Sequence, residues 1–362
     1  MEIVGLNRAF WRGRRVLVTG HTGFKGSWLS LWLQALGAEV TGLALAPPSE
    51  PSMFETARVA LDMASRLVNI RDAQAVQAAV QAADPEVILH LAAQSLVRPS
   101  YADPVATYAT NVMGTAHLLQ AARSLRHLKA VLVVTSDKCY ENREWLWGYR
   151  ENEALGGYDP YSSSKGCAEL VTAAFRNSFF PVARHADHGV AVASARAGNV
   201  VGGGDWATDR LIPDCIRAIE AGLPIRIRSP HAVRPWQHVL EPLTGYLMLA
   251  ERLYIEGPSF AEAWNFGPAD EDARPVQWVV EEVVRGWGDG VRWEVDASHT
   301  PHEAGLLRLD SSKARARLGW HPRWPLAVGL QKIGAWHRAQ AARADMREFT
   351  LAQIGEFEAC NG

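Results

Sequence analysis

The amino-acid sequence predicts an α/β protein with a doubly wound parallel sheet and a smaller C-terminal lobe. Short apolar runs alternate with helical patterns, a glycine-rich turn follows the first apolar run, and the alternation stops near residue 198. Buried parallel strands are continuous apolar runs because helices cover both faces of their sheet. Strands that alternate with long helices form βαβ units, which build such a sheet.

The expected elements follow from these two patterns. The strands are expected at residues 15–19, 40–45, 67–70, 87–91, 130–135 and 190–196. The helices are expected at residues 25–36, 73–82, 107–125 and 162–179. The alternating segment 225–228, Ile-Arg-Ile-Arg, indicates one more strand, with two arginines on one exposed face.

Length and composition limit the classes of protein to consider. The 362 residues suffice for two domains or for one large domain with a second lobe. With 37 Lys and Arg against 39 Asp and Glu, the chain lacks the basic excess of a nucleic-acid-binding protein. No apolar run is long enough to span a bilayer, and the four cysteines lack metal-ligand spacing. We therefore expect a cytoplasmic protein with reduced thiols and no metal site.

A glycine loop follows the first expected strand and opens the first helix. Glycines at this spacing permit a tight turn, let backbone N–H groups approach a pyrophosphate, and allow close helix–strand packing. The alternative is a purely structural turn. We expect a Rossmann-type dinucleotide site formed by Gly20, His21, Thr22, Gly23, Phe24, Lys25 and Gly26. The second strand ends in residues 43–46, Leu-Ala-Leu-Ala, with no arginine for a 2′-phosphate, which favours NAD over NADP.

Five residues are candidates for catalysis. Tyr161 and Lys165 lie one helical turn apart, so they face the same side. A tyrosine base must lower its pKa by about three units, and an ammonium about 4 Å away has roughly that effect. Ser136, Asp137 and Lys138 follow the fifth expected strand, where carboxyl ends of parallel strands border the ligand crevice. A solvated helix face and a polar strand end are the structural alternatives.

These motifs resemble the extended short-chain dehydrogenase/reductase family. The resemblance rests on the glycine loop, the segment 90–93 (His-Leu-Ala-Ala), Asn111 and the Tyr161/Lys165 pair, and it covers nearly the whole chain. Residues 20–26, 136–140, 156–161, 196–206 and 234–238 resemble, more narrowly, the CDP-D-glucose 4,6-dehydratases. Related dTDP- and GDP-sugar dehydratases usually carry Asp-Glu in place of Asp137-Lys138, and the epimerases carry small uncharged residues.

The resemblance implies a hydro-lyase with tightly bound NAD that converts CDP-D-glucose to CDP-4-dehydro-6-deoxy-D-glucose. Tyr161 would take the C4 hydroxyl proton while Ser136 bonds the C4 oxygen. The C4 ketone then makes the C5 proton acidic, so that water can leave across C5 and C6 before the hydride returns to C6. Protonated Asp137 would donate to the departing hydroxyl. Lys138 would be the C5 base, or alternatively a charged group that only orients the substrate.

The remaining expected ligand contacts follow from the resemblance and from ligand charge. A nucleoside diphosphate favours arginine because the planar guanidinium matches phosphate geometry. At the substrate we expect Gln94, Arg98, Asn199, Arg210, Arg228, Arg234 and His302. At the cofactor we also expect Asn69, Ile70, Leu91, Ala92, Ala93, Thr110, Tyr161 and Lys165.

Domain organisation and assembly are expected as follows. Residues 1–197 form the NAD-binding domain and residues 198–362 the nucleotide-sugar-binding lobe, with interleaved boundaries. The resemblance implies a homodimer through helices 107–125 and 162–179, with a tetramer left open. Two rival functions remain: another nucleotide-sugar 4,6-dehydratase or 4-epimerase of this fold, and a non-catalytic dinucleotide-binding regulator.

Overall fold

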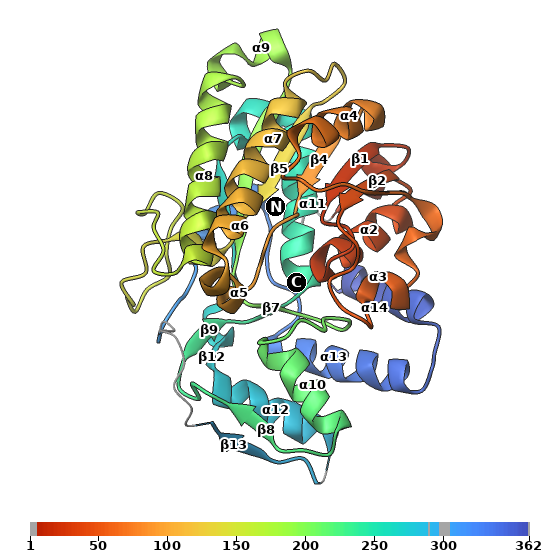
Figure 1. The fold of residues 1–362 in the computed structure, drawn as a ribbon, viewed down its shortest axis with the longest axis vertical. Helices are drawn as coiled ribbons and strands as arrows, with labels where there is room; N and C mark the ends of the chain where they lie inside the picture. Colours follow the sequence, from red (N-terminus) through yellow and green to blue (C-terminus); the bar gives the residue numbers. More distant parts are fainter. Residues whose placement is uncertain (1–5, 289, 297–304, 361–362) are drawn as a thin grey trace.

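The computed structural model describes residues 6–288, 290–296 and 305–360 of the chain, and its centre is a seven-stranded parallel sheet (Figure 1). The strand order is β11-β6-β5-β4-β1-β2-β3, and each neighbouring pair is parallel. This order confirms the predicted Rossmann-type fold. The strands are β1 (Arg15–Thr19), β2 (Glu39–Ala44), β3 (Ala64–Leu67), β4 (Val87–His90), β5 (Ala130–Val134), β6 (Ala191–Ala197) and β11 (Ala263–Phe266).

Helices cover both faces of the sheet. One layer contains α2 (Phe24–Ala35), α11 (Leu240–Glu256) and α14 (Met346–Ala359), and the other contains α4 (Ala73–Ala83), α7 (Gly114–Ala122) and α8 (Pro160–Ser178). Along β1, Val16 and Val18 belong to the first core and Leu17 to the second. Side chains alternate between the faces of a strand, so a strand buried on both faces has to be apolar throughout.

A smaller lobe lies beside the carboxyl ends of the strands. Its core packs Ile216 of α10 and Val280 of α12 around Trp236. Its helices are α10 (Leu211–Glu220), α12 (Val276–Trp287) and α13 (Leu326–Ala341). Its paired strands are β8 (Ile225–Ile227) with β13 (Trp293–Val295), β9 (Val233–Pro235) with β12 (Ala273–Pro275), and β7 (Val200–Val201) with β10 (Gln237–His238).

Short elements connect these layers. They are α1 (Arg8–Trp11), α3 (Met53–Thr56), α5 (Val97–Ala102), α6 (Pro104–Tyr108) and α9 (His185–His188), with η1 (Val59–Asp62), η2 (Ala109–Met113), η3 (Asp137–Cys139), η4 (Val182–Arg184), η5 (Gly257–Phe260), η6 (Asp270–Asp272) and η7 (Ala314–Leu318).

The structure differs from the expected elements in three places. The third strand begins at Ala64, three residues before the expected start. The long helix expected at 107–125 is divided into α6, the π-helical turn η2 and α7. The seventh strand, β11, and the helix α11 come from the C-terminal half of the chain and complete the central fold. Four-residue β11 has too short a pattern to be told from a loop.

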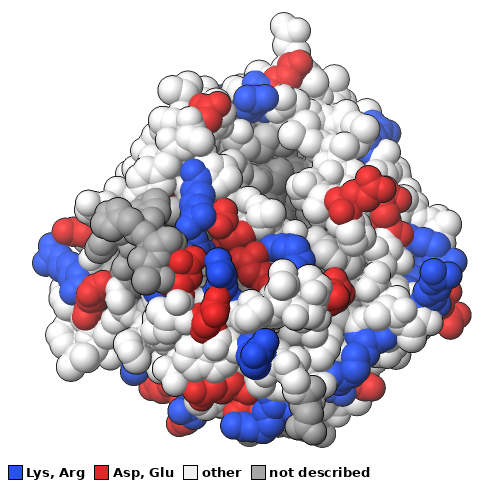
Figure 2. All heavy atoms as spheres, turned by 60° about the horizontal axis from the view of Figure 1, so that its bottom comes forward, with Lys and Arg blue, Asp and Glu red and all other residues white. Residues whose placement is uncertain are grey.

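Two further observations concern the described residues as a whole. None of the helices in the described part of the chain has the length and apolar character needed to cross a membrane. Among the same residues, no group of three or more His, Cys, Asp or Glu side chains could hold a metal ion. Figure 2 shows basic and acidic side chains interspersed over the face that carries the smaller lobe.

Candidate active site

A cleft of about 2010 Å³ lies between the sheet and the smaller lobe. A site for one small molecule commonly occupies roughly 300–1,000 Å³, so this cleft has room for two ligands. Its wall contains all the candidate residues of the sequence analysis except His21 and His302. His302 lies outside the described residues.

The glycine loop forms one end of the cleft. Gly20 adopts a left-handed φ of +76°, and a Cβ on Gly26 would lie 2.1 Å from the carbonyl oxygen of Gly20. Helix α2 begins at Phe24, and no side chain caps its first backbone N–H groups. Free N–H groups at a helix start are donors for an anion. The loop therefore fits the pyrophosphate of a dinucleotide.

His21 is the one described candidate that does not line the cleft, and its expected contact with the cofactor as part of the glycine loop stays a prediction. Its Nε2 lies 2.7 Å from Ser65 Oγ, and its ring occupies the space that a Cβ on Gly42 would need. Burial lowers the pKa of His21 to about 4. The imidazole is therefore a neutral packing group that links the loop to β2 and β3.

The other expected cofactor contacts come from the ends of neighbouring strands. Asn69 and Ile70 follow β3, the segment 91–93 follows β4, and Thr110 lies in η2, and all of them line the cleft. The cleft wall beside β2 contains residues 44–46, which offer no arginine to a 2′-phosphate. The lining therefore fits a dinucleotide without that phosphate.

Tyr161 and Lys165 are held at the start of α8. Pro160 occupies the first helical turn, and the Asp159 carboxylate caps the helix by accepting a hydrogen bond from Ser162 N at 2.9 Å. The Tyr161 backbone N–H donates to Ser100 Oγ at 3.1 Å. A proline and an aspartate at these positions are the usual helix-start signals. The local sequence therefore determines the start of α8 and, with it, the positions of Tyr161 and Lys165 in the first turns of this helix.

A π-helical turn supports this helix from the other side. Asn111 lies in η2, and its Nδ2 donates to Ser164 Oγ at 2.8 Å and to the Gln94 carbonyl at 2.9 Å. Its Oδ1 accepts a hydrogen bond from Gln94 N at 2.8 Å. Such turns inside helices are frequent at functional sites. Asn111 therefore joins α8 to the cleft-lining segment after β4.

The pKa of Tyr161 departs from the expectation. Burial raises it to about 12, although a hydrogen bond with Ser136 lowers it. Burial also lowers the pKa of Lys165 to about 8, and its Nζ donates to the Val134 carbonyl at 3.4 Å. Desolvation of the phenolate is thus larger than the attraction of the nearby cations. The protein groups around Tyr161 therefore raise its pKa and do not lower it as predicted.

Asp137 and Lys138 begin the tight turn η3 after β5, and Ser136 caps this turn. Ser136 Oγ donates to Asp137 Oδ1 at 2.9 Å and accepts from Lys138 N at 3.2 Å. Lys138 Nζ lies 6.0 Å from the centre of the Tyr161 ring. Asp137 Oδ2 is buried and has no hydrogen-bond partner among the residues that the structure describes, and burial raises the pKa of this carboxyl. A protonated Asp137 can therefore donate a hydrogen bond into the cleft.

The expected substrate arginines converge on the loop before α10. Arg210 donates to Asp205 at 2.8 Å and to Ser95 Oγ at 2.9 Å, while Arg98 and Arg228 both lie against Asp209. Arg234 is buried on β9, where its Nη1 donates to the Val233 carbonyl at 3.0 Å. These guanidinium groups line the cleft together with Gln94 and Asn199.

Sequence reasoning missed two residues near the site, Tyr246 and Glu169. Tyr246 of α11 is fully buried, its hydroxyl has no hydrogen-bond partner among described residues, and its ring lies 5.8 Å from Lys25 Nζ. Burial lowers the pKa of Lys25 to about 7, and Lys165 and Arg210 lower it further. Glu169 follows Lys165 by one turn and accepts a hydrogen bond from Thr135. The i, i+4 spacing to Lys165 was the one available signal for Glu169.

The fold and the site define the class of protein. A Rossmann-type sheet, a glycine loop at the start of α2, and a buried Tyr161/Lys165 pair beside η3 are the features of an extended short-chain dehydrogenase/reductase. Residues 17–333 match the family described as GDP-mannose 4,6 dehydratase, and this chain belongs to that family. The resemblance drawn from the motifs is thereby confirmed.

Known proteins support this membership. The chain is 55% identical to a CDP-glucose 4,6-dehydratase of Salmonella typhimurium over 97% of this chain and 98% of that protein. It is 28% identical to a dTDP-glucose 4,6-dehydratase of Streptomyces niveus over 91% of this chain and 94% of the relative. Among solved structures, a dTDP-glucose 4,6-dehydratase of Bacillus anthracis in complex with NAD has a TM-score of 0.73 at 20% identity, covering 92% and 99% of the two chains.

Proposed function

We propose that this protein is an NAD-dependent hydro-lyase that converts CDP-D-glucose to CDP-4-dehydro-6-deoxy-D-glucose, a reaction that feeds deoxysugar synthesis. The observation that carries the proposal is the buried Asp137 carboxyl, whose Oδ2 has no hydrogen-bond partner among the described residues, in one cleft with Lys138 and Tyr161. The 55% identity to a CDP-glucose 4,6-dehydratase supports the choice of nucleotide. The Asp-Lys pair distinguishes this site from that of an epimerase, which has no hydroxyl to expel.

The first part of the mechanism acts at C4 of the glucose. Tyr161 takes the proton of the C4 hydroxyl, and Ser136, which lines the same cleft, orients the same oxygen. A bound NAD would supply the acceptor for the C4 hydride and the source of the hydride that C6 receives. The glycine loop, Asn69, the segment 91–93 and Thr110 would hold it. Because burial raises the Tyr161 pKa to about 12, a positive charge near the phenol is needed for this step.

The second part expels water. Lys138 removes the C5 proton, and protonated Asp137 gives its proton to the departing C6 hydroxyl, so that one water leaves. The raised pKa of Asp137 favours the protonated acid that this step needs. At the end a proton returns to C5. Asp137 and Lys138 are adjacent in η3 and therefore can act on neighbouring carbons of one sugar.

The test is incubation with a panel of CDP-glucose, dTDP-glucose, UDP-glucose and GDP-mannose with trace NAD. A 4-keto-6-deoxy product from CDP-glucose alone, with deuterium moved from C4 to C6, supports the proposal. Turnover of another nucleotide sugar would assign a different 4,6-dehydratase. Inversion at C4 would indicate an epimerase, and NAD binding without turnover would indicate a regulator.

We further propose a cytoplasmic homodimer. Val105 of α6, Met113 of η2 and Leu170 of α8 expose apolar side chains, with 76%, 50% and 59% of their surface accessible. Exposed apolar side chains on neighbouring helices favour a partner surface. A Leu170→Glu variant should shift the light-scattering mass toward the monomer. A monomeric wild-type protein would contradict the homodimer. The four cysteines form no disulfide, which supports a reducing compartment.

A further inference from the structure

Asp209 joins two arginines that come from opposite sides of the cleft. Its Oδ1 lies 3.0 Å from Arg98 Nη1 and 3.6 Å from Arg228 Nη1. Arg98 belongs to α5 beside the central sheet, whereas Arg228 follows β8 of the smaller lobe. All three residues line the cleft. A single carboxylate oxygen therefore bridges the two walls; we call Arg98, Asp209 and Arg228 the carboxylate clasp.

The backbone at the clasp is in an unusual conformation. Asp209 has a φ of +60°, in the left-handed region that non-glycine residues rarely adopt. Its neighbour Arg210 is held by Asp205 and by Ser95 Oγ, at 2.8 and 2.9 Å. The loop is therefore fixed at Arg210, and the left-handed turn directs the Asp209 carboxylate to the two arginines. Strained residues of this kind often occur at ligand sites.

The ion pairs of the carboxylate clasp can be broken at little cost, so that the arginines can bind another anion. The side chains of Arg98 and Asp209 are 43% and 36% exposed, and ion pairs with this much solvent contribute little to folding. Guanidinium groups bind phosphate oxygens through two parallel hydrogen bonds, and a diphosphate carries more charge than one carboxylate. A diphosphate can thus take both arginines away from Asp209 at a small cost in folding free energy.

We propose that Asp209 is an internal competitor for the diphosphate of the substrate: its carboxylate holds Arg98 and Arg228, is displaced when a nucleoside diphosphate binds, and returns when the product leaves. This inference rests on the proposed function, because it assumes a diphosphate ligand. It assigns Asp209 a role opposite to that of the arginines. They increase affinity, whereas Asp209 decreases it and speeds release.

The test is calorimetric titration of wild type and Asp209→Asn with CDP and with inorganic pyrophosphate. The variant lacks the two ion pairs with Asp209, so the dissociation constants of CDP and of pyrophosphate should fall by about three- to thirty-fold. Stopped-flow measurement should show slower CDP dissociation. Asp214→Asn is the matched control, because Asp214 also lines the cleft but pairs with Arg217 on its own helix.

Three outcomes would overturn the inference. Unchanged or weaker binding by Asp209→Asn would make Asp209 a support for the arginines. An equal gain in affinity in Asp214→Asn would show that the gain in Asp209→Asn comes only from the change in net charge. An Asp209→Asn effect that persists undiminished in an Arg98→Gln background would remove the clasp as its cause. The proposed function fails separately, if wild type binds CDP no better than pyrophosphate.

Discussion

The guanidinium of Arg196 donates to the carboxylate of Glu169 at 2.8 Å, and these side chains are only 4% and 3% exposed. Glu169 also accepts hydrogen bonds from Thr135 and from Ser194, and Arg196 Nη1 donates to Tyr140 OH at 2.7 Å. Thr135 directly precedes the segment 136–139, which contains three of the catalytic candidates, and Tyr140 directly follows it. One buried ion pair therefore anchors both ends of the segment 136–139.

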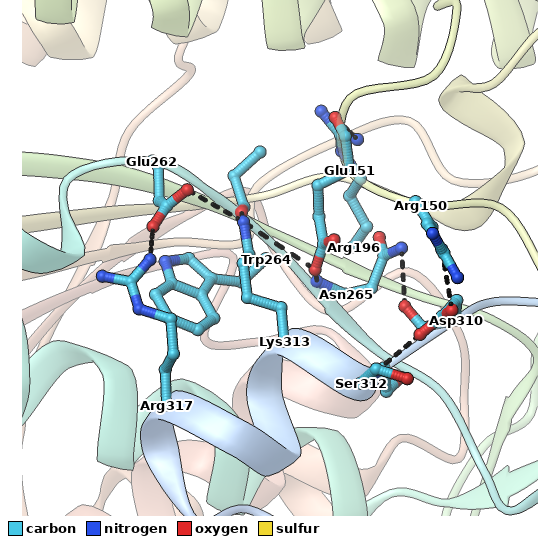
Figure 3. Close-up of polar contacts among 12 residues, drawn as sticks. Arg150, Glu151, Arg196, Glu262, Trp264, Asn265, Asp310, Ser312, Lys313 and Arg317 are labelled. Atoms are coloured by element: carbon cyan, nitrogen blue, oxygen red, sulfur yellow. Dashed lines mark hydrogen bonds and ion pairs between the residues drawn. The ribbon is translucent and has the colours of Figure 1, made fainter.

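The same pair is linked through Tyr140 to Asn265 of β11. Tyr140 OH donates to Asn265 Oδ1 at 2.7 Å, and Asn265 N donates to Glu151 at 2.9 Å. Figure 3 shows Arg196, Glu151 and Asn265 grouped together, with Lys313 and Arg317 on the neighbouring helical segment directed toward Glu262. Strand β11 is therefore hydrogen-bonded to Tyr140, the residue that follows the segment 136–139.

Breaking the buried ion pair should destabilise the protein strongly. Glu169→Gln leaves Arg196 buried without its counter-charge, and we expect a loss of about 3–5 kcal/mol in the free energy of unfolding. Urea unfolding followed by circular dichroism measures it. Arg184→Gln, which breaks the exposed pair with Asp187, is the control and should cost about 0–1 kcal/mol. Similar losses for the two variants would contradict a structural role for the buried pair.

Removing the Tyr161 hydroxyl should abolish the first chemical step while the fold remains. The ring of Tyr161 is buried, and phenylalanine keeps its packing. We expect Tyr161→Phe to lower kcat by about 10²–10⁴-fold, since it removes the group that takes the C4 proton. Activity with CDP-glucose, together with an unchanged urea midpoint, checks this. Near-normal kcat would assign the proton transfer to another group.

Replacing Lys138 should separate oxidation from elimination. Lys138→Met keeps an unbranched side chain one atom shorter but removes the amine, so we expect no exchange of the C5 hydrogen with deuterated solvent. Absorbance at 340 nm should then show reduced cofactor accumulating on the enzyme. Lys332→Met, on the surface beside Glu356, is the control. Undiminished C5 exchange in Lys138→Met would leave Lys138 as an orienting group only.

Acid should destabilise the protein through buried histidines. His238 is 1% exposed between Trp28 and Trp324, and burial lowers its pKa to about 3, against about 6.5 when unfolded. Between these values the unfolded chain binds the proton and the folded chain does not. Stability is therefore complete above about pH 6.5 and falls as the pH drops toward 3.

A His238→Phe variant lacks the imidazole that binds this proton and keeps an aromatic ring in the same place. Its free energy of unfolding should decline less steeply between pH 6 and 4, by up to about 1.4 kcal/mol per pH unit. Urea titrations at several pH values measure the slope. The exposed His231→Phe provides the comparison. Equal slopes in wild type and His238→Phe would assign the acid sensitivity to other groups.

Local patterns in the sequence predicted most of the central fold and many cleft-lining residues. Apolar runs placed five of the seven sheet strands to within one residue, because both faces of the sheet are buried there, whereas exposed β3 overlaps its expected run only at Leu67. The Asp159-Pro160 start signal placed Tyr161 and Lys165 at the beginning of α8. Helix caps and strand periodicity act over a few residues, so the sequence shows them directly.

The sequence by itself determined the glycine loop, the order of the βαβ units and the side chains offered to the cleft. Only the tertiary structure decided that His21 turns into the core, that β11 joins the sheet, and that Asp209 meets Arg98 and Arg228. It also decided the direction of the Tyr161 pKa shift. Burial and contacts between distant segments depend on how the whole chain packs, and no local pattern encodes them.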